Sequence, residues 1–257
     1  KRYFTPGDKH TVFDLSHVRL GVNICEDIWF EDVTHFQALK GDAGVIINIS
    51  SSPYHMGKWK IRRDLLSMRA LDNCAVVIYV NQVGGQDELV FDGQSWIIGP
   101  DGEVIASGKQ FQEDFIIFDL DTEELRKNRE NNEIFQKRKR LFQSNEKLNL
   151  TKLKEWYGKP HKKIIKPVDI ETLQEDEEIY EALVLGLRDY IRKNGFKKVI
   201  LGLSGGIDSA LAAAIAVDAL GKENVTGVAM PSIYSSEGSL KDAEKLAQNF
   251  GIEYIVI

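Results

Sequence analysis

The sequence predicts an α/β protein made of two units, and three features of the chain support this. Short β-branched runs alternate with longer runs whose apolar residues recur every three or four positions. In the second half this alternation is regular, which is typical of a parallel sheet with connecting helices. A charged stretch with few β-branched residues, 126–163, separates the halves. We expect a first domain over 1–121, a charged linker over 122–168 and a second domain over 169–257.

In the first domain, Gly, Asn or Pro turn signals bound several of the expected elements. The predicted strands are 18–24, 44–49, 75–81, 94–98, 103–106 and 115–120. Helices are expected at 32–40 and 58–73. Pro100-Asp101-Gly102 predicts a hairpin turn between the fourth and fifth strands. The basic run at 137–140 lies among glutamates and apolar residues, so we interpret it as part of a solvated helical linker and not as a nucleic-acid arm.

The second domain begins with a helix whose apolar residues, from Ile179 to Ile191, follow helical spacing. The predicted elements after it are strand 198–203, helix 209–220, strand 225–229, helix 236–250 and strand 253–257. This order predicts a doubly wound parallel sheet, in which ligands bind beyond the carboxyl ends of the strands. The loop that starts at Ser204 and the segment that starts at Met230 both fall there, although Met230 fits a core position equally well.

Composition limits the classes of function. The 257 residues carry a formal net charge of −6, which gives no support to nucleic-acid binding. Two cysteines are too few for a disulfide framework, and no apolar run reaches transmembrane length. We therefore expect a soluble, cytoplasmic protein with no membrane partner. The first residue is lysine and the last lies inside a predicted strand, so we interpret the sequence as an excerpt of a longer polypeptide.

The run Ser204-Gly205-Gly206-Ile207-Asp208-Ser209 stands where a predicted strand becomes a helix. Two glycines let the backbone turn tightly and direct successive N–H groups at one anion, and the helix start adds its own unpaired N–H groups. The pattern predicts a phosphate-binding loop. No lysine follows the glycines, so it is not the GxxxxGK[ST] loop.

Cys25 directly follows the predicted buried strand 18–24 and precedes two acidic residues and Trp29. A cysteine in this place is either a small core residue or a nucleophile at a turn. Cys74, at the start of an apolar run, is expected to be inert core.

Both motifs resemble those of known families. SGGxDS resembles the pyrophosphatase loop of enzymes that cleave ATP between its α and β phosphates, in which the aspartate, here Asp208, helps to bind Mg²⁺. The resemblance implies an ATP-binding set of Gly202, Leu203, Ser204, Gly205, Gly206, Ile207, Asp208 and Ser209. The segment around Cys25 resembles the nucleophile elbow of the nitrilase superfamily. Residues 48–54 and the pair Gly57-Lys58 extend that resemblance.

Together the two motifs resemble the glutamine-dependent NAD⁺ synthetases. This implies the C-terminal half of a nitrilase-like αββα sandwich, followed by the start of an adenine nucleotide α-hydrolase-like domain. It also implies that Cys25 attacks glutamine to release ammonia, that Ser52 and Lys58 bind glutamine, and that the N–H of Glu26 stabilises the oxyanion. ATP would adenylate deamido-NAD⁺, and ammonia would convert the adenylate to NAD⁺ and AMP. The family suggests a homo-oligomer.

The chain also departs from the family's pattern. Residues 1–24 contain no glutamate for the catalytic base, and Lys1 and Lys9 lie too near Cys25 to match the family's lysine. Both catalytic partners are expected upstream, and most deamido-NAD⁺ contacts are expected beyond Ile257. Two alternatives stay open at this point. One is another ATP-pyrophosphatase amidotransferase, and the other is a nucleotide-binding scaffold if the excerpt is the whole chain.

Overall fold

The computed structural model describes residues 5, 7, 9–153 and 171–257, and the chain divides into two compact units. The first unit comprises Lys1–Gln82 and Gly93–Thr172, and the second comprises Val83–Asp92 and Leu173–Ile257. In the described part of the chain, no helix is long and apolar enough to cross a membrane.

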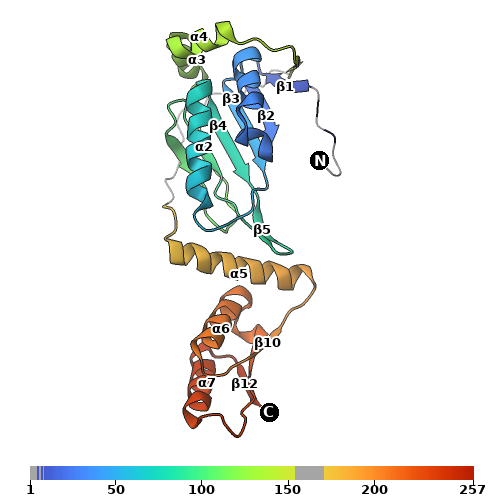
Figure 1. Cartoon of the computed structure of the whole chain (residues 1–257), viewed down its shortest axis with the longest axis vertical. Helices are drawn as coiled ribbons and strands as arrows, with labels where there is room; N and C mark the ends of the chain where they lie inside the picture. The colour runs from blue at the N-terminus through green and yellow to red at the C-terminus, as the bar shows by residue number, and fades with distance from the viewer. Residues whose placement is uncertain (1–4, 6, 8, 154–170) are drawn as a thin grey trace. The chain divides into compact units, whose positions relative to one another are not determined.

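The first unit is built on a seven-stranded sheet of order β8-β7-β4-β3-β2-β1-β9. Figure 1 labels β1 to β4 of this sheet. Its strands are β1 (Lys9–Asp14), β2 (Arg19–Ile24), β3 (Val45–Ser50), β4 (Val76–Asn81), β7 (Trp96–Ile98), β8 (Val104–Ser107) and β9 (Lys147–Lys152). β2, β3 and β4 are parallel, with Ile24 opposite Ile49 and Ile49 opposite Val80. Their carboxyl ends therefore meet at one edge of the sheet.

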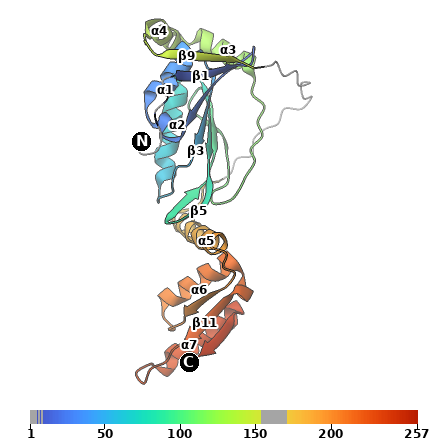
Figure 2. The same ribbon diagram turned by 90° about the vertical axis from the view of Figure 1, so that its right-hand side faces the viewer.

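Helices cover one face of this sheet (Figure 2). They are α1 (Glu31–His35), the π-helix Phe36–Lys40 that continues it, and α2 (Lys58–Asn73). The side chains of a strand alternate between its two faces, so Ile46 of β3 packs with Leu66 and Ala70 of α2, while Val45 joins a separate cluster. The helices predicted at 32–40 and 58–73 are confirmed.

The prediction of a strand at 115–120 is wrong. This segment forms no strand, and its apolar side chains Ile116, Phe118 and Leu120 pack in the cluster that contains Val45. Every second side chain of this segment packs in that cluster, while Phe115 and Ile117 are exposed, so the sequence alternates as it would in a strand. The other five predicted strands of this unit are confirmed within two residues, as is the turn at Pro100-Asp101-Gly102, where Gly102 has a φ of +81°.

The stretch after Asp121 contains α3 (Thr122–Asn131), α4 (Glu133–Leu141) and then β9. The helices agree with the expected helical character, but the strand was not expected. β9 pairs in parallel with β1, and Leu125 of α3 and Phe135 of α4 are buried. Arg138 and Lys139 of the basic run pair with Asp72 and Asp42. The last part of the expected linker, 154–170, lies outside the described residues.

The second unit alternates strands and helices as predicted. Its elements are α5 (Glu175–Lys193), β10 (Val199–Gly202), α6 (Ile207–Leu220), a 3-10 turn (Lys222–Asn224), β11 (Val225–Ala229), α7 (Glu237–Phe250) and β12 (Glu253–Val256). The strands form a parallel sheet of order β10-β11-β12. Right-handed crossovers between sequential parallel strands place α6 and α7 on the same face, as Figure 2 shows.

A hairpin that was not predicted, β5 (Val83–Gln86) and β6 (Leu89–Asp92), packs on α5. The N–H of Gly85 donates to Oδ2 of Asp189 at 2.8 Å, and the ammonium of Lys193 donates to the carbonyl of Gly85. A Cβ at Gly85 would lie 3.1 Å from the Cβ of Asp189 and 3.3 Å from the Cα of Gly186. The glycine thus allows the close approach of hairpin and helix.

Candidate functional sites

Cys25 occupies a strained turn at the carboxyl end of β2. It begins the 3-10 helix Cys25–Trp29 and has a φ of +48°, in the left-handed region that non-glycine residues rarely adopt. Such a conformation costs on the order of 1–3 kcal/mol and persists only where surrounding contacts hold it. The residue is partly exposed. Cys74 has a left-handed backbone as well but is buried, so it is the exposure of the Cys25 thiol that fits a nucleophile.

Three sets of hydrogen bonds hold this turn. The Asp27 carboxylate accepts from the N–H of Ile24 at 2.9 Å, and Nδ2 of Asn48 donates to the carbonyl of Cys25 at 3.3 Å. Arg69 of α2 donates to the carbonyls of Ile28 and Trp29 at 3.0 and 2.8 Å. Glu26 is the second residue of the 3-10 helix, where a backbone N–H has no acceptor within the helix. That geometry leaves this N–H able to bind an oxyanion.

Ser52 lies in the loop after β3, the strand next to β2, and Lys58 begins α2 at the end of that loop. The Ser52 N–H donates to Oδ1 of Asn81 at 2.9 Å, and the residue is only 3% exposed. The ammonium of Lys58 donates to the carbonyl of Pro53 at 2.7 Å, and its backbone N–H donates to the carbonyl of His55. Because β2 and β3 are parallel, their carboxyl ends bring this loop and the Cys25 turn to the same edge of the sheet.

Cys74 does not open a strand, as the sequence suggested. It is the C-cap of α2, with a φ of +43°, and β4 begins only at Val76. The residue is buried, and burial raises the pKa of its thiol. A buried thiol with a raised pKa is a poor nucleophile, so the expectation that Cys74 is core is confirmed.

The loop after β10 is held by its own serines. Oγ of Ser209 accepts from the N–H of Ser204 at 3.3 Å and donates to the carbonyl of Gly206 at 2.9 Å. Gly205 has a φ of +81° and Gly206 is the N-cap of α6, without a side-chain cap. The other residues of the predicted set lie around this loop: Gly202 ends β10, Leu203 is buried, and Ile207 begins α6.

A cleft of about 500 Å³ opens beside this loop. It is lined on one side by residues 202–204 and on the other by Ala229, Met230 and the segment up to Leu240. Met230 is 64% exposed, so the alternative that it belongs to the core is excluded. Ser236, the N-cap of α7, and Ser239 also line the cleft. Loop and segment thus face one cavity, as the strand order predicted.

Asp208 is the second residue of α6 and is exposed. No hydrogen bond or ion pair joins its carboxylate to another residue in the described part of the chain. The described residues also hold no group of three or more His, Cys, Asp or Glu side chains that fits a metal ion. Mg²⁺ in nucleotide sites is bound by one or two carboxylates together with phosphate oxygens and waters. A single unpaired carboxylate beside a phosphate loop fits that arrangement.

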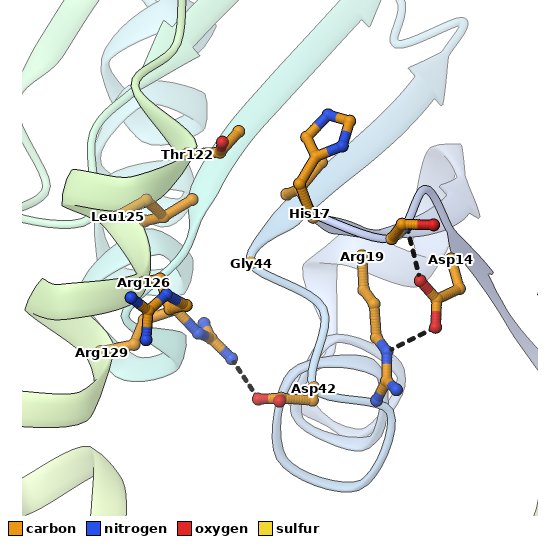
Figure 3. Close-up of a pocket in the computed structure, with 11 residues that line it drawn as sticks. Asp14, His17, Arg19, Asp42, Gly44, Thr122, Leu125, Arg126 and Arg129 are labelled. Atoms are coloured by element: carbon orange, nitrogen blue, oxygen red, sulfur yellow. Dashed lines mark hydrogen bonds and ion pairs between the residues drawn. The ribbon is translucent and has the colours of Figure 1, made fainter. Parts of the chain in front are cut away.

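A second hollow, of about 230 Å³, lies where β2 and β3 begin, at the opposite end of these strands from Cys25 (Figure 3). It contains three arginines, but each is engaged by protein groups. Arg19 pairs with Asp14, Arg129 with Asp42, and Arg126 with two glutamates of its own helix. We therefore assign the hollow no part in the chemistry at Cys25.

Comparison with known families identifies the family of the region that contains Cys25. Residues 1–130, just over half of the 257, match the carbon–nitrogen hydrolase family model. The chain belongs to the carbon–nitrogen hydrolase family. The hydrolase region is followed by a second match, at residues 179–257, to the NAD synthase model. The predicted order, a nitrilase-like region followed by a nucleotide-binding α/β region, is confirmed.

This carbon–nitrogen hydrolase chain is similar over its whole length to curated proteins named glutamine-dependent NAD(+) synthetase. It is 46% identical to the one from Aquifex aeolicus and 45% identical to the one from Thermotoga maritima, covering 100% of this chain and 44% of each relative. The solved glutamine-dependent NAD⁺ synthetase from Acinetobacter baumannii in complex with ADP aligns with a TM-score of 0.78 at 36% identity, over 99% of this chain and 41% of that one. The chain therefore spans less than half the length of the relatives it matches.

Proposed function

We propose that this chain is part of an enzyme that makes NAD⁺ from deamido-NAD⁺, ATP and glutamine. The observation that carries the proposal is the presence of two features in one chain, each at the carboxyl end of a parallel strand. One is the left-handed turn at Cys25, and the other is the Ser204–Ser209 loop, which is held by hydrogen bonds between its own residues. The relatives that share both regions are named for this activity. A hydrolase region of this type also argues against other ATP-pyrophosphatase amidotransferases, which use different glutaminase domains.

At the first site, Cys25 is the nucleophile. Its thiolate attacks the side-chain carbonyl of glutamine, the N–H of Glu26 stabilises the oxyanion, and the C–N bond breaks to release ammonia. Water then cleaves the thioester to give glutamate and restores the thiol. Ser52 and Lys58, at the same sheet edge, bind the glutamine substrate. The glutamate and lysine that complete such a site are predicted to lie upstream of this chain.

At the second site, the Ser204–Ser209 loop and the start of α6 bind the phosphates of ATP. The carboxylate of deamido-NAD⁺ attacks the α phosphate, and pyrophosphate leaves. Ammonia then attacks the acyl-adenylate to give NAD⁺ and AMP. When bound, Mg²⁺ neutralises charge on the triphosphate, and Asp208 is the residue that would hold it. A homo-oligomeric assembly and a cytoplasmic location stay predictions of the sequence.

The test is to give the natural protein glutamine labelled with ¹⁵N at the side-chain amide, together with Mg-ATP and deamido-NAD⁺. We expect NAD⁺ that carries one ¹⁵N, with AMP and pyrophosphate formed in equal amounts. Formation of ADP and phosphate, or absence of the label from NAD⁺, would contradict the proposal. If the label entered another carboxylic acid in place of deamido-NAD⁺, the chain would be a different amidotransferase.

A further inference from the structure

Three buried amide side chains form a hydrogen-bonded row beneath the Cys25 turn. They come from β2, β3 and the π-helix, and each is at most 3% exposed: Asn23, Asn48 and Gln37. Nδ2 of Asn48 donates to Oδ1 of Asn23 at 2.7 Å, and Nδ2 of Asn23 donates to Oε1 of Gln37 at 3.2 Å. Asn23 and Asn48 are directly opposite each other in the parallel strands.

The direction of this row is fixed at Gln37. Its Nε2 faces two backbone carbonyls, those of Val22 at 2.8 Å and Thr11 at 3.3 Å. Only an amide NH₂ group can donate to both, so the oxygen of Gln37 must face Asn23. Asn23 then has to present its own oxygen to Asn48. The orientation of each amide follows from its neighbour, and the row ends with an N–H of Asn48.

The second N–H of Asn48 is donated to the carbonyl of Cys25, at 3.3 Å. That carbonyl belongs to the residue with a φ of +48°. In contrast, Oδ1 of Asn48 is buried and has no hydrogen-bond partner among the described residues. Burying an unpaired amide oxygen costs about 1–3 kcal/mol. The Asn48 side chain thus donates one N–H to Asn23 and the other to the Cys25 turn and leaves its oxygen unsatisfied, which is an inefficient arrangement for stability alone.

We propose that Asn48 is a positioning residue for Cys25. It holds the left-handed turn through the carbonyl of Cys25, while Asn23 and Gln37 fix the orientation of its amide. Without this bond the turn relaxes towards ordinary backbone angles, and the thiol moves away from the position it needs for attack. The inference rests on the proposed role of Cys25 as the nucleophile.

The chain offers a matched control. Asn73, in α2, is also fully buried, donates one N–H to a backbone carbonyl, that of Arg69, and leaves its own Oδ1 unpaired among the described residues. It is the last residue of α2, at the opposite end of the helix from Lys58. Asn73→Ala therefore removes a comparable buried amide that bonds to the backbone carbonyl of Arg69, not to its guanidinium, and that makes no direct hydrogen bond to the Cys25 turn.

The experiment compares Asn48→Ala, Asn23→Ala and Asn73→Ala in the natural protein. The readouts are the rate at which iodoacetamide alkylates Cys25, kcat and KM with glutamine, NAD⁺ synthesis from free ammonia, and the thermal midpoint. For Asn48→Ala we expect alkylation and glutamine-dependent kcat to fall roughly 10- to 100-fold, because small displacements of reacting atoms have effects of this size. KM and ammonia-dependent synthesis should stay near wild type. Asn23→Ala should show a smaller loss, because Asn48 keeps its bond to Cys25 but is free to rotate.

Asn73→Ala should lower the thermal midpoint without changing alkylation of Cys25. Equal alkylation and equal kcat in Asn48→Ala and Asn73→Ala would overturn the proposal and leave Asn48 a purely structural amide. If Asn48→Ala does not fold, Asn23→Ala is compared with Asn73→Ala instead. Equal alkylation of Cys25 and equal glutamine-dependent kcat in these two variants would then overturn the proposal. Failure of the proposed function is distinguishable, since it would appear as glutamine-dependent activity that survives Cys25→Ala.

Discussion

Gly205 lies directly against the backbone of Ser239. A Cβ at Gly205 would be 2.8 Å from the Cα of Ser239 and would overlap its carbonyl oxygen. The residue also has a φ of +81°. Two independent constraints, a left-handed backbone and contact with the backbone of Ser239, therefore require glycine here. The contact holds the Ser204–Ser209 loop against the first turn of α7.

The first prediction is that Gly205→Ala weakens ATP binding and destabilises the fold. Gly195 supplies the control, because its φ is +78° but a Cβ there would meet nothing within 4 Å. Gly195→Ala should cost only the backbone strain, about 1 kcal/mol. Gly205→Ala should cost more, and only this variant should lose ATP affinity in calorimetry. Equal unfolding free energies and equal affinities for the two variants would show that the contact with Ser239 is unimportant.

The second prediction concerns Asp208. The structure makes Gly206 the N-cap of α6, so Asp208 does not cap the helix. Asp208→Asn should therefore fold normally, apart from a small loss of helix-dipole stabilisation. If Asp208 holds Mg²⁺, the variant should lose most NAD⁺ synthesis with glutamine and with ammonia, and excess Mg²⁺ should restore part of it. Full activity of the folded variant at ordinary Mg²⁺ concentration would exclude the metal role.

The third prediction concerns glutamine binding by Lys58. Lys58→Met should raise KM for glutamine and leave kcat largely unchanged if the ammonium binds substrate and transition state equally. Lys60, two residues later in α2, is exposed and lies over the ring of Trp59, so Lys60→Met is the matched control. Steady-state kinetics of both variants make the comparison. The same KM in both would show that the Lys58 ammonium has no part in binding glutamine.

The fourth prediction is a loss of stability on mild acidification that depends on His35. Burial lowers the pKa of His35 below its usual value and outweighs the nearby carboxylates of Glu31 and Asp72, which raise it; Arg138 and Arg69 add to the lowering. The unfolded chain then binds a proton at a pH where the folded chain does not. Stability that is complete above the unfolded value, about pH 6.5, is lost as pH falls from there towards the folded pKa.

Urea unfolding at about pH 7.5 and at about pH 5.5 measures this dependence, since the two conditions bracket the unfolded pKa of histidine. His35→Gln should reduce the difference between the two midpoints. His17→Gln, at an exposed position of the same unit, should leave it unchanged. The account would be wrong if His35→Gln kept the full wild-type difference.

The sequence predicted most of the elements because their periodicity is local. It did so most fully in the second unit, where each strand and helix follows its own pattern and the strand order then places the Ser204 loop opposite Met230. Arg129 illustrates what local patterns miss. It lies in a stretch that reads as a charged linker, yet its buried guanidinium donates to the carbonyls of Ala38, Asn73 and Cys74. Those acceptors are distant in sequence, so no pattern around Arg129 predicts its burial.

The same limit applies to the cysteine site. The position of Cys25 directly after a strand could be predicted, since that pattern is local in the sequence. The amides that hold it were not predicted, although Asn23 and Asn48 interrupt two apolar strands at equivalent positions. Only the pairing of β2 with β3 shows that they are neighbours. The hairpin Val83–Asp92 was missed because both strands have only four residues and two of those in β5 are glycine, and its packing partner α5 lies about a hundred residues later.

The most direct test of the central claim is the nitrogen source used by Cys25→Ala. In the natural protein this variant should lose NAD⁺ synthesis from glutamine and keep synthesis from free ammonia near the wild-type rate, because the ATP loop does not depend on the thiol. Cys74→Ala, at the buried cap of α2, serves as the control and should use both nitrogen sources. If Cys25→Ala used glutamine at the wild-type rate, Cys25 would not be the nucleophile and the proposed function of the hydrolase region would be wrong.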